Sequence, residues 1–307
     1  MTVLALTTVR RGVTRGEPHG AIYLLDLEHG RAAHVVDWSR PAIDWGGYGG
    51  DRGLRGIVVE GDRVFVASSD SVLQFAPDFT LHETHCSPYL KHAQGMAVFD
   101  GRLYVASAAY DAVLALDLAT GRFVWGLHLI EDEAGLRAAP FDPSGSLGPS
   151  PGNRLHLSSL FCDPRGMFIA GLRTRGLLRF DGQRIKRLVT LPEGARDVRP
   201  WRDGVLFNDS LNDAARFLTP ERNRVFRTPH YPAEALSHDD CSEHVARQGF
   251  ARGLCVLDAD RFAAASSPLT VCVHDVASMA TTQRINLDTD IRHAAHGMTA
   301  WPFDVPD

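Results

Sequence analysis

Six positions, each at or just ahead of the start of an apolar run, carry side chains that can bind anions or move protons. In chain order they are Arg55, Gln94, His156, Arg199, Arg252 and His296. The set is basic and contains no carboxylate, although the chain has a formal net charge of −5. Arginine binds carboxylate, sulfate or phosphate through a planar fork, and imidazole titrates near neutral pH. We therefore expect the arginines and the glutamine to bind an anionic small molecule, and the two histidines to act as catalytic acid and base.

The histidines also allow a metal site. Four of them, His92, His156, His293 and His296, come from three of these regions, and His92 and His293 occupy matching repeat positions. Imidazole ligands favour iron, zinc, copper or nickel over calcium or magnesium, so one divalent transition metal is the alternative cofactor. Residues three apart on a strand point to opposite faces. We therefore expect only one of His293 and His296 to enter a channel, unless that segment is a loop.

A purely structural role for the arginines is the competing interpretation. Carboxylates such as Asp44, Asp51 or Asp197 can form ion pairs with them and plug the channel. In that case no ligand is needed to balance the positive charge.

The elements that must position these residues are repeated hairpins. Each unit has an apolar run, a short turn with Gly or Asp, a second apolar run, a polar break and a third run, in residues 54–75, 93–116, 155–180, 198–218 and 251–276. Turns such as EGDR (60–63) and FDGR (99–102) supply the backbone angles of tight hairpins. Short runs such as VFVAS and LYVAS are typical of strands buried on both faces. Their spacing predicts the blades of a β-propeller.

The two ends of the chain complement each other. The segment IRHAAHGMTAW (291–301) repeats the pattern of LKHAQGMAVF (90–99) but is followed by almost nothing. Residues 3–9, 21–30 and 31–38 predict three strands that lack an innermost partner. Joining the ends completes a sixth blade and removes exposed sheet edges. The sequence therefore predicts an all-β, six-bladed β-propeller, a single domain over 1–307 closed by its N-terminal strands. Unrelated hairpins in a sandwich or an open sheet are the alternative.

Two insertions interrupt the period. Residues 128–154 are rich in Pro, Gly and Ser, and residues 230–249 contain SHDDCSEH, which we interpret as a solvated loop more readily than as a metal site. Both precede an innermost strand, so we expect two loops over the same mouth of the channel, where they can cap a ligand. Trp45 and Tyr48 lie among glycines in residues 41–53 and are expected to line this pocket, or else to pack against blade edges.

Three segments carry a resemblance to a known group of proteins. RDVRPWRDGVLFNDS (196–210), GFARGLCVLDADRFAAAS (249–266) and LHLSSLFCD (155–163) resemble an uncharacterised bacterial family of six-bladed propellers, loosely similar to NHL-type and gluconolactonase-type proteins. The resemblance covers roughly residues 50–300 and implies the fold, but little about activity. A gluconolactonase-type calcium site would need oxygen ligands. Here those are Gln94 and, away from the axis, Asn208 and Asp209.

Composition limits the classes of function. The chain of 307 residues is 44% hydrophobic and 22% charged, as in soluble globular proteins. Its negative net charge gives no reason to expect nucleic-acid or membrane partners. Neither a membrane-spanning run nor a secretory leader is present in the sequence, so we expect a cytoplasmic protein. Five cysteines without C-x-x-C spacing predict reduced thiols, mostly buried.

These observations predict a small-molecule enzyme that acts on an anionic metabolite in a basic central channel. Hydrolase, lyase and isomerase chemistry all fit histidine acid–base catalysis. A metal-dependent enzyme with channel histidines as ligands is one alternative. A non-catalytic propeller scaffold for protein interaction is the other, because a fold does not imply a function. The sequence contains no nucleophile elbow, P-loop or dinucleotide-binding motif.

Overall fold

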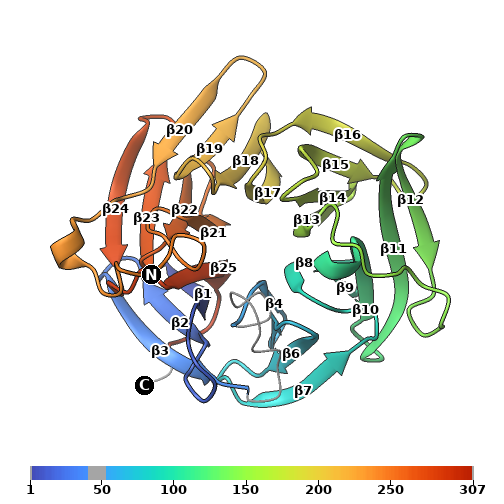
Figure 1. Cartoon of the computed structure of the whole chain (residues 1–307), viewed down its shortest axis with the longest axis horizontal. Helices are drawn as coiled ribbons and strands as arrows, with labels where there is room; N and C mark the ends of the chain where they lie inside the picture. The colour runs from blue at the N-terminus through green and yellow to red at the C-terminus, as the bar shows by residue number, and fades with distance from the viewer. Residues whose placement is uncertain (1, 41–52, 306–307) are drawn as a thin grey trace.

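Six antiparallel sheets are arranged around a central axis (Figure 1). This computed structural model describes residues 2–40 and 53–305. The predicted all-β, six-bladed propeller is confirmed, because the described residues form these sheets and, besides strands, only two 3₁₀ turns, η1 (Ala108–Tyr110) and η2 (Ala233–Ala235). Within the same residues, no helix has the length and apolar character needed to cross a bilayer.

Five sheets are built from consecutive strands, with the innermost strand first in the chain. The first two are β4 (Ile57–Glu60), β5 (Arg63–Ala67), β6 (Ser71–Phe75) and β7 (Leu81–Cys86), then β8 (Ala93–Phe99), β9 (Arg102–Ser107), β10 (Ala112–Asp117), β11 (Arg122–Asp132) and β12 (Gly135–Phe141). The third is β13 (Leu157–Asp163), β14 (Gly166–Gly171), β15 (Gly176–Phe180) and β16 (Ile185–Thr190). The last two are β17 (Ala195–Trp201), β18 (Gly204–Asp209), β19 (Ala214–Leu218) and β20 (Asn223–Arg227), then β21 (Ala251–Val256), β22 (Arg261–Ser266), β23 (Thr270–Asp275) and β24 (Ala280–Asn286).

The sixth sheet is shared by the two ends of the chain. Its order is β25 (His293–Trp301), β1 (Val3–Arg10), β2 (Gly20–Asp26) and β3 (Arg31–Trp38). Strand β1 pairs antiparallel with β25 from Val3↔Trp301 to Arg10↔His293. The prediction that the N-terminal strands complete the last blade is therefore confirmed.

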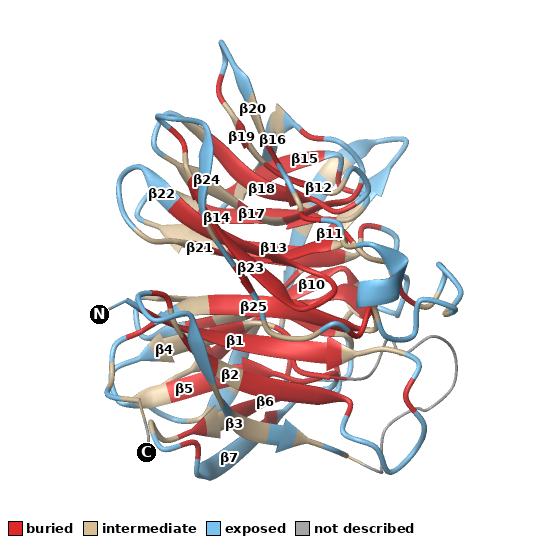
Figure 2. Ribbon diagram, turned by 90° about the vertical axis from the view of Figure 1, so that its left-hand side faces the viewer, coloured by how far each residue is buried: buried red, intermediate tan, exposed pale blue. Residues whose placement is uncertain are grey.

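The hydrophobic core lies between neighbouring blades. Six apolar clusters each join side chains of two adjacent sheets. Strand β1 shows why a run of apolar residues begins it: Leu4 and Leu6 pack on one neighbouring sheet, and Val3 and Ala5 on the other. In Figure 2 the middle strands of the blades, such as β1, β6 and β10, are mostly red and outer strands such as β7 are pale, as expected for middle strands with two buried faces.

Part of the first predicted loop is a strand. Strand β11 continues to Asp132 and pairs with β12, so the second blade has five strands. The loop prediction for residues 128–141 was wrong because it rested on the Pro, Gly and Ser content of the insertion, whereas a proline such as Pro140 is tolerated in an edge strand. Leu136 and Ala138 alternate with exposed residues and pack, together with Trp125, on the apolar cluster between the second and third blades. Residues 142–154 are irregular, as predicted, and 230–249 hold only η2 and an isolated bridge between Ser237 and Asp290.

Candidate functional site

The innermost strands carry β-bulges where they begin. In β8, β17 and β21, two residues oppose a single residue of the next strand, and in β13 one extra residue lies between Leu157 and Ser159. A bulge changes which side chain faces the axis. The pairing puts Gln94, Asp197 and Arg252 at the same bulge position of their strands.

Glycines let these strands approach one another at the bulges. A Cβ on Gly95 would lie 2.7 Å from the carbonyl oxygen of Ser158, and one on Gly56 would collide with the carbonyl oxygen of Gln94. The amide of Gly56 donates to the Gln94 carbonyl at 3.2 Å. Such contacts explain the Gly that follows Arg55, Gln94 and His296. The Gly that follows Arg252 instead has a positive φ of 82°, which favours glycine.

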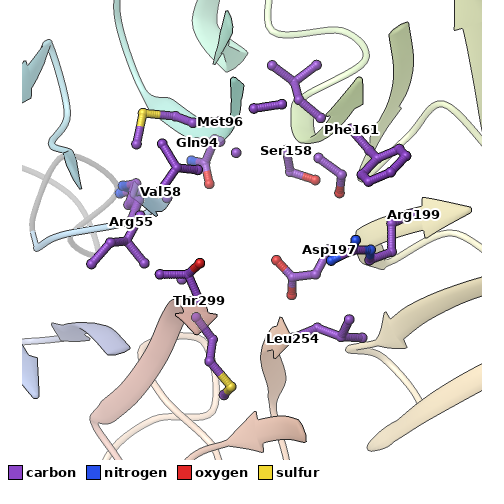
Figure 3. Close-up of a pocket in the computed structure, with 18 of the residues that line it drawn as sticks. Arg55, Val58, Gln94, Met96, Ser158, Phe161, Asp197, Arg199, Leu254 and Thr299 are labelled. Atoms are coloured by element: carbon purple, nitrogen blue, oxygen red, sulfur yellow. The ribbon is translucent and has the colours of Figure 1, made fainter. Parts of the chain in front are cut away.

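One side chain from each blade lines the same section of the channel. These six residues, here called the ring, are Arg55, Gln94, Ser158, Asp197, Arg252 and His296. Figure 3 shows Gln94, Ser158 and Asp197 facing the centre from different blades. The repeat alignment placed His156 and Arg199 where the structure has Ser158 and Asp197, because it ignored the bulges. The ring therefore contains a carboxylate, and the expected absence of one was wrong.

A hydrogen bond crosses the channel within the ring. Arg252 Nη2 donates to Gln94 Oε1 at 2.7 Å. Their strands, β21 and β8, belong to blades three apart in a ring of six and so lie on opposite sides of the axis (Figure 1). The bond divides the channel into two pockets. The entry pocket lies before the strands begin, and the exit pocket lies further along them.

The entry pocket is strongly basic. It has a volume of about 330 Å³. Besides four ring residues (Arg55, Gln94, Arg252 and His296), it is lined by Val9, Arg11, His92, Asn153, His156, His244 and Val245. Asn153 belongs to the first predicted insertion and His244 to the second. Both insertions therefore reach this mouth, as predicted.

Three arginines around this pocket lie close to other cations, and Asp197 is the described carboxylate whose charge acts on two of them, Arg196 and Arg252. In the described part of the chain, no carboxylate lies within ion-pair distance of Arg11, Arg196 or Arg252. Arg196 and Arg252 are only 8% and 5% exposed. Burial, and then the charges of Arg252 and Arg247, lower the pKa of Arg11 to about 10. The same combination of burial and cationic neighbours holds the pKa of Arg196 well below its usual value.

The two candidate catalytic histidines are held in the neutral form. His156 Nδ1 lies 2.8 Å from Asn153 Oδ1, and the amide of His156 donates to the buried carboxylate of Asp111 at 2.9 Å. Burial, followed by the charges of Arg196 and Arg252, lowers the pKa of His156 to about 3. His296 is 6% exposed, and neither ring nitrogen has a hydrogen-bond partner among the described residues. Burial, then Arg252, also depresses its pKa strongly.

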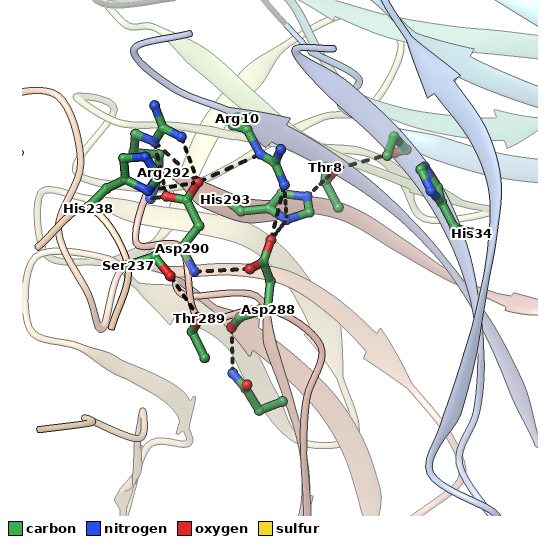
Figure 4. Close-up of polar contacts among 12 residues, drawn as sticks. Thr8, Arg10, His34, Ser237, His238, Asp288, Thr289, Asp290, Arg292 and His293 are labelled. Carbon is green, nitrogen blue, oxygen red and sulfur yellow. Dashed lines mark hydrogen bonds and ion pairs between the residues drawn. The ribbon is translucent and has the colours of Figure 1, made fainter. Parts of the chain in front are cut away.

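His293 lies outside the channel, in a separate polar cluster. Its Nδ1 is 2.7 Å from Asp288 Oδ2 and its Nε2 is 2.9 Å from Thr8 Oγ1, as Figure 4 shows. Only His296 of this pair enters the channel, as the strand spacing predicted. The four histidines therefore do not form one metal site. Over residues 2–40 and 53–305, no group of three or more His, Cys, Asp or Glu side chains is placed to hold a metal ion.

The remaining predicted residues fall in three places. His92 lines the entry pocket. Arg199 lies on the exit side, with its guanidinium 4.9 Å from the centre of the Phe161 ring. Trp45 and Tyr48 lie outside the described residues.

Sequence reasoning assigned no role at the site to Arg11 or Arg196. Both lie over the face of Phe250, at 4.3 Å and 5.7 Å from its centre. A signal for Arg11 was present in the closure of the sixth blade. It follows the residue of β1 that pairs with His293, so it must lie near the channel entry.

Comparisons with known proteins give the fold. No family model and no curated protein matches the chain. A protein of unknown function from Bacteroides caccae has a TM-score of 0.59 at 10% identity, over 97% of this chain and 98% of that one. A chain of a nidogen/laminin complex scores 0.57 at 12% identity over 97% and 98%, and a candidate 6-phosphogluconolactonase from Bacteroides fragilis NCTC 9343 scores 0.55 at 10% over 97% of both. The resemblance to six-bladed propellers is thus confirmed at the level of the fold.

Proposed function

We propose that this chain is a cytoplasmic enzyme that binds a small anionic metabolite in the entry pocket. The observation that carries the proposal is the group of buried arginines without carboxylate partners in the described residues. A buried charge without a partner is costly, and the cost is removed when an opposite charge enters. An anion among Arg11, Arg196 and Arg252 would supply that charge and accept N–H donors such as Arg252 Nε, which has no partner among the described atoms.

The chemistry we propose is proton transfer by His296 and His156. Neutral imidazoles can accept a proton, and the charge of a bound anion would raise their pKa toward the range useful for catalysis. The arginines would then stabilise negative charge that develops on the ligand. Hydrolysis, elimination and isomerisation all use these roles.

In the alternative interpretation, the ring arginines pair with carboxylates, plug the channel and bind no ligand. Asp197 is the described carboxylate closest to that role, and its charge favours the ionised form of Arg252. However, within the described structure Arg252 donates to Gln94 and forms no ion pair with Asp197, whose Oδ2 accepts hydrogen bonds from the amide of Gly253 at 3.0 Å and from Asn208 Nδ2 at 2.9 Å. If the arginines only plug the channel, removing one will destabilise the fold. If they form a binding site, removing one will relieve repulsion.

The test is Arg252→Gln, with inorganic phosphate and sulfate as probes. We expect the unliganded variant to be as stable as the wild type or more stable, because one of several repelling charges is gone. We expect its affinity for the probes, measured by calorimetry, to fall by about tenfold or more. The matched control is Arg261→Gln in the same blade, whose arginine is exposed and paired with Asp258 at 2.7 Å. Loss of stability in Arg252→Gln together with no probe binding by the wild type would overturn the proposal.

A further inference from the structure

The exit pocket lies on the other side of the Gln94–Arg252 hydrogen bond from the entry pocket. The side chains that line the two pockets differ in chemistry. The volume of the exit pocket is about 280 Å³, at the small end of ligand pockets. On the side of the ring that faces away from the entry pocket, most of the side chains that line the wall are apolar, among them Val58, Met96, Phe161, Leu254 and Met298. The entry pocket has only Val9 and Val245 as apolar lining. Two ligands of different character therefore suit the two pockets.

Acceptor groups face the exit pocket from two neighbouring blades. Ser158 is 3% exposed, and its hydroxyl has no partner among the described residues. Asp197 binds Gly253 and Asn208 through Oδ2, which leaves Oδ1 available to a ligand. Both side chains point toward the centre of the pocket in Figure 3. A carboxylate and a hydroxyl together are suited to a ligand group that donates several hydrogen bonds, such as an ammonium group.

A cation stands beside these acceptors. Arg199 follows Asp197 by two residues on β17 and lines the same pocket. Its Nε is buried and has no hydrogen-bond partner in the described structure, while its guanidinium lies over the face of Phe161. A guanidinium fixed in this way can bind a carboxylate.

We propose that the exit pocket is a second binding site, which takes a small α-amino acid with an apolar side chain. The carboxylate of the ligand pairs with Arg199. Its ammonium group donates to Asp197 and Ser158, and its side chain packs on Met96, Leu254 and Met298. A zwitterion pairs with both Arg199 and Asp197, whereas a simple anion leaves Asp197 Oδ1 without a ligand group to accept from.

The experiment is calorimetry with L-leucine and L-methionine on the full chain. Two analogues of leucine separate the contacts: 4-methylpentanoate lacks the amino group, and 2-hydroxy-4-methylpentanoate replaces it with a neutral donor. We expect leucine to bind, the hydroxy acid to bind more weakly and 4-methylpentanoate to bind about tenfold more weakly or not at all. The proposal is wrong if neither amino acid binds, or if 4-methylpentanoate binds as tightly as leucine.

Variants assign the binding to this pocket. We expect Asp197→Asn, which keeps an acceptor oxygen for Gly253 and Asn208, and Arg199→Gln each to weaken leucine binding by about tenfold. The matched control is Arg202→Gln, since Arg202 is on the surface and pairs with Asp260 at 2.9 Å. Phosphate binding at the entry pocket should survive Arg199→Gln, while Arg11→Gln should weaken phosphate and spare leucine. This pattern keeps failure of the second site distinct from failure of the first. Leucine binding that is unchanged in both exit-pocket variants would place the amino acid elsewhere and overturn the proposal.

Discussion

Burial is the main cause that lowers the pKa of the two entry-pocket histidines, and arginines of other blades lower it further. His156 precedes β13 and His296 lies in β25, yet the charges that depress their pKa come from arginines such as Arg196 on β17 and Arg252 on β21. An unliganded pocket therefore holds neutral imidazoles at neutral pH. A bound anion offsets the arginine charges, so it must raise both pKa values.

The consequence is proton uptake on anion binding. If the bound form holds more protons than the free form, affinity for sulfate rises as pH falls through the raised histidine pKa. We expect calorimetry in buffers of different ionisation enthalpy to show net uptake for the wild type, and none for the double variant with His156→Gln and His296→Gln. Sulfate is the probe because it does not titrate in this range. Net proton release on binding would contradict this account of the pocket.

Strands and bulges act at the next scale, where they set which residues meet. The strands were predictable from short runs such as VFVAS and LYVAS, because a strand that is buried on both faces consists mostly of apolar and small residues. The bulges of β13 and β17 were not predictable from single residues, since an extra residue depends on how the strand pairs with its neighbour. This is why Ser158 and Asp197, and not His156 and Arg199, complete the ring.

A buried histidine in the fifth blade gives a test at this scale. His274 of β23 lies 4.9 Å from Phe226 and 5.0 Å from Phe262, measured between ring centres, and burial lowers its pKa to about 4. The unfolded chain binds a proton here below its ordinary pKa of 6.5 and the folded chain does not, so stability is full above that pH and is lost toward pH 4. We expect the loss of unfolding free energy on acidification to be smaller in His274→Gln by about 3 kcal/mol. Urea titrations at several pH values measure it, and parallel slopes for the two proteins would disprove the assignment.

At the scale of the whole molecule, the fold depends on the closure between the two ends of the chain. Besides backbone pairing of β1 with β25, a polar cluster joins them: Arg10 Nη2 donates to Asp288 Oδ2 at 3.1 Å, and Asp288 also contacts His293. Burial alone would raise the pKa of Asp288, but the hydrogen bond from His293 and the charge of Arg10 outweigh it and give about 2 (Figure 4). The carboxylate is therefore ionised at every pH at which the protein is expected to be folded.

Removing this charge should loosen the closure. We expect Asp288→Asn to reduce the unfolding free energy at neutral pH by about 1–2 kcal/mol, allowing for partial exposure of the pair. The folded pKa is below the unfolded one, so the advantage of the wild type is present above pH 3.8 and disappears as pH falls toward 2. Denaturant titrations against pH measure the difference. Asp37→Asn is the control, because Asp37 is exposed and its ion pair among the described residues is with His34 in the outer strand of the same sheet, where little change is expected.

The number of blades and the pairing of the chain ends could be predicted from the sequence, because hairpin turns and two-sided apolar strands are local signals that repeat along the chain. The same repeat pattern predicted Arg55, Gln94, Arg252 and His296 at the channel, where the structure has them. The residues that complete the ring, the position of His293 outside the channel and the neutral state of the histidines became apparent only in the folded protein. They depend on strand register, on burial and on charges from distant blades, and none of these is encoded in the residues nearby.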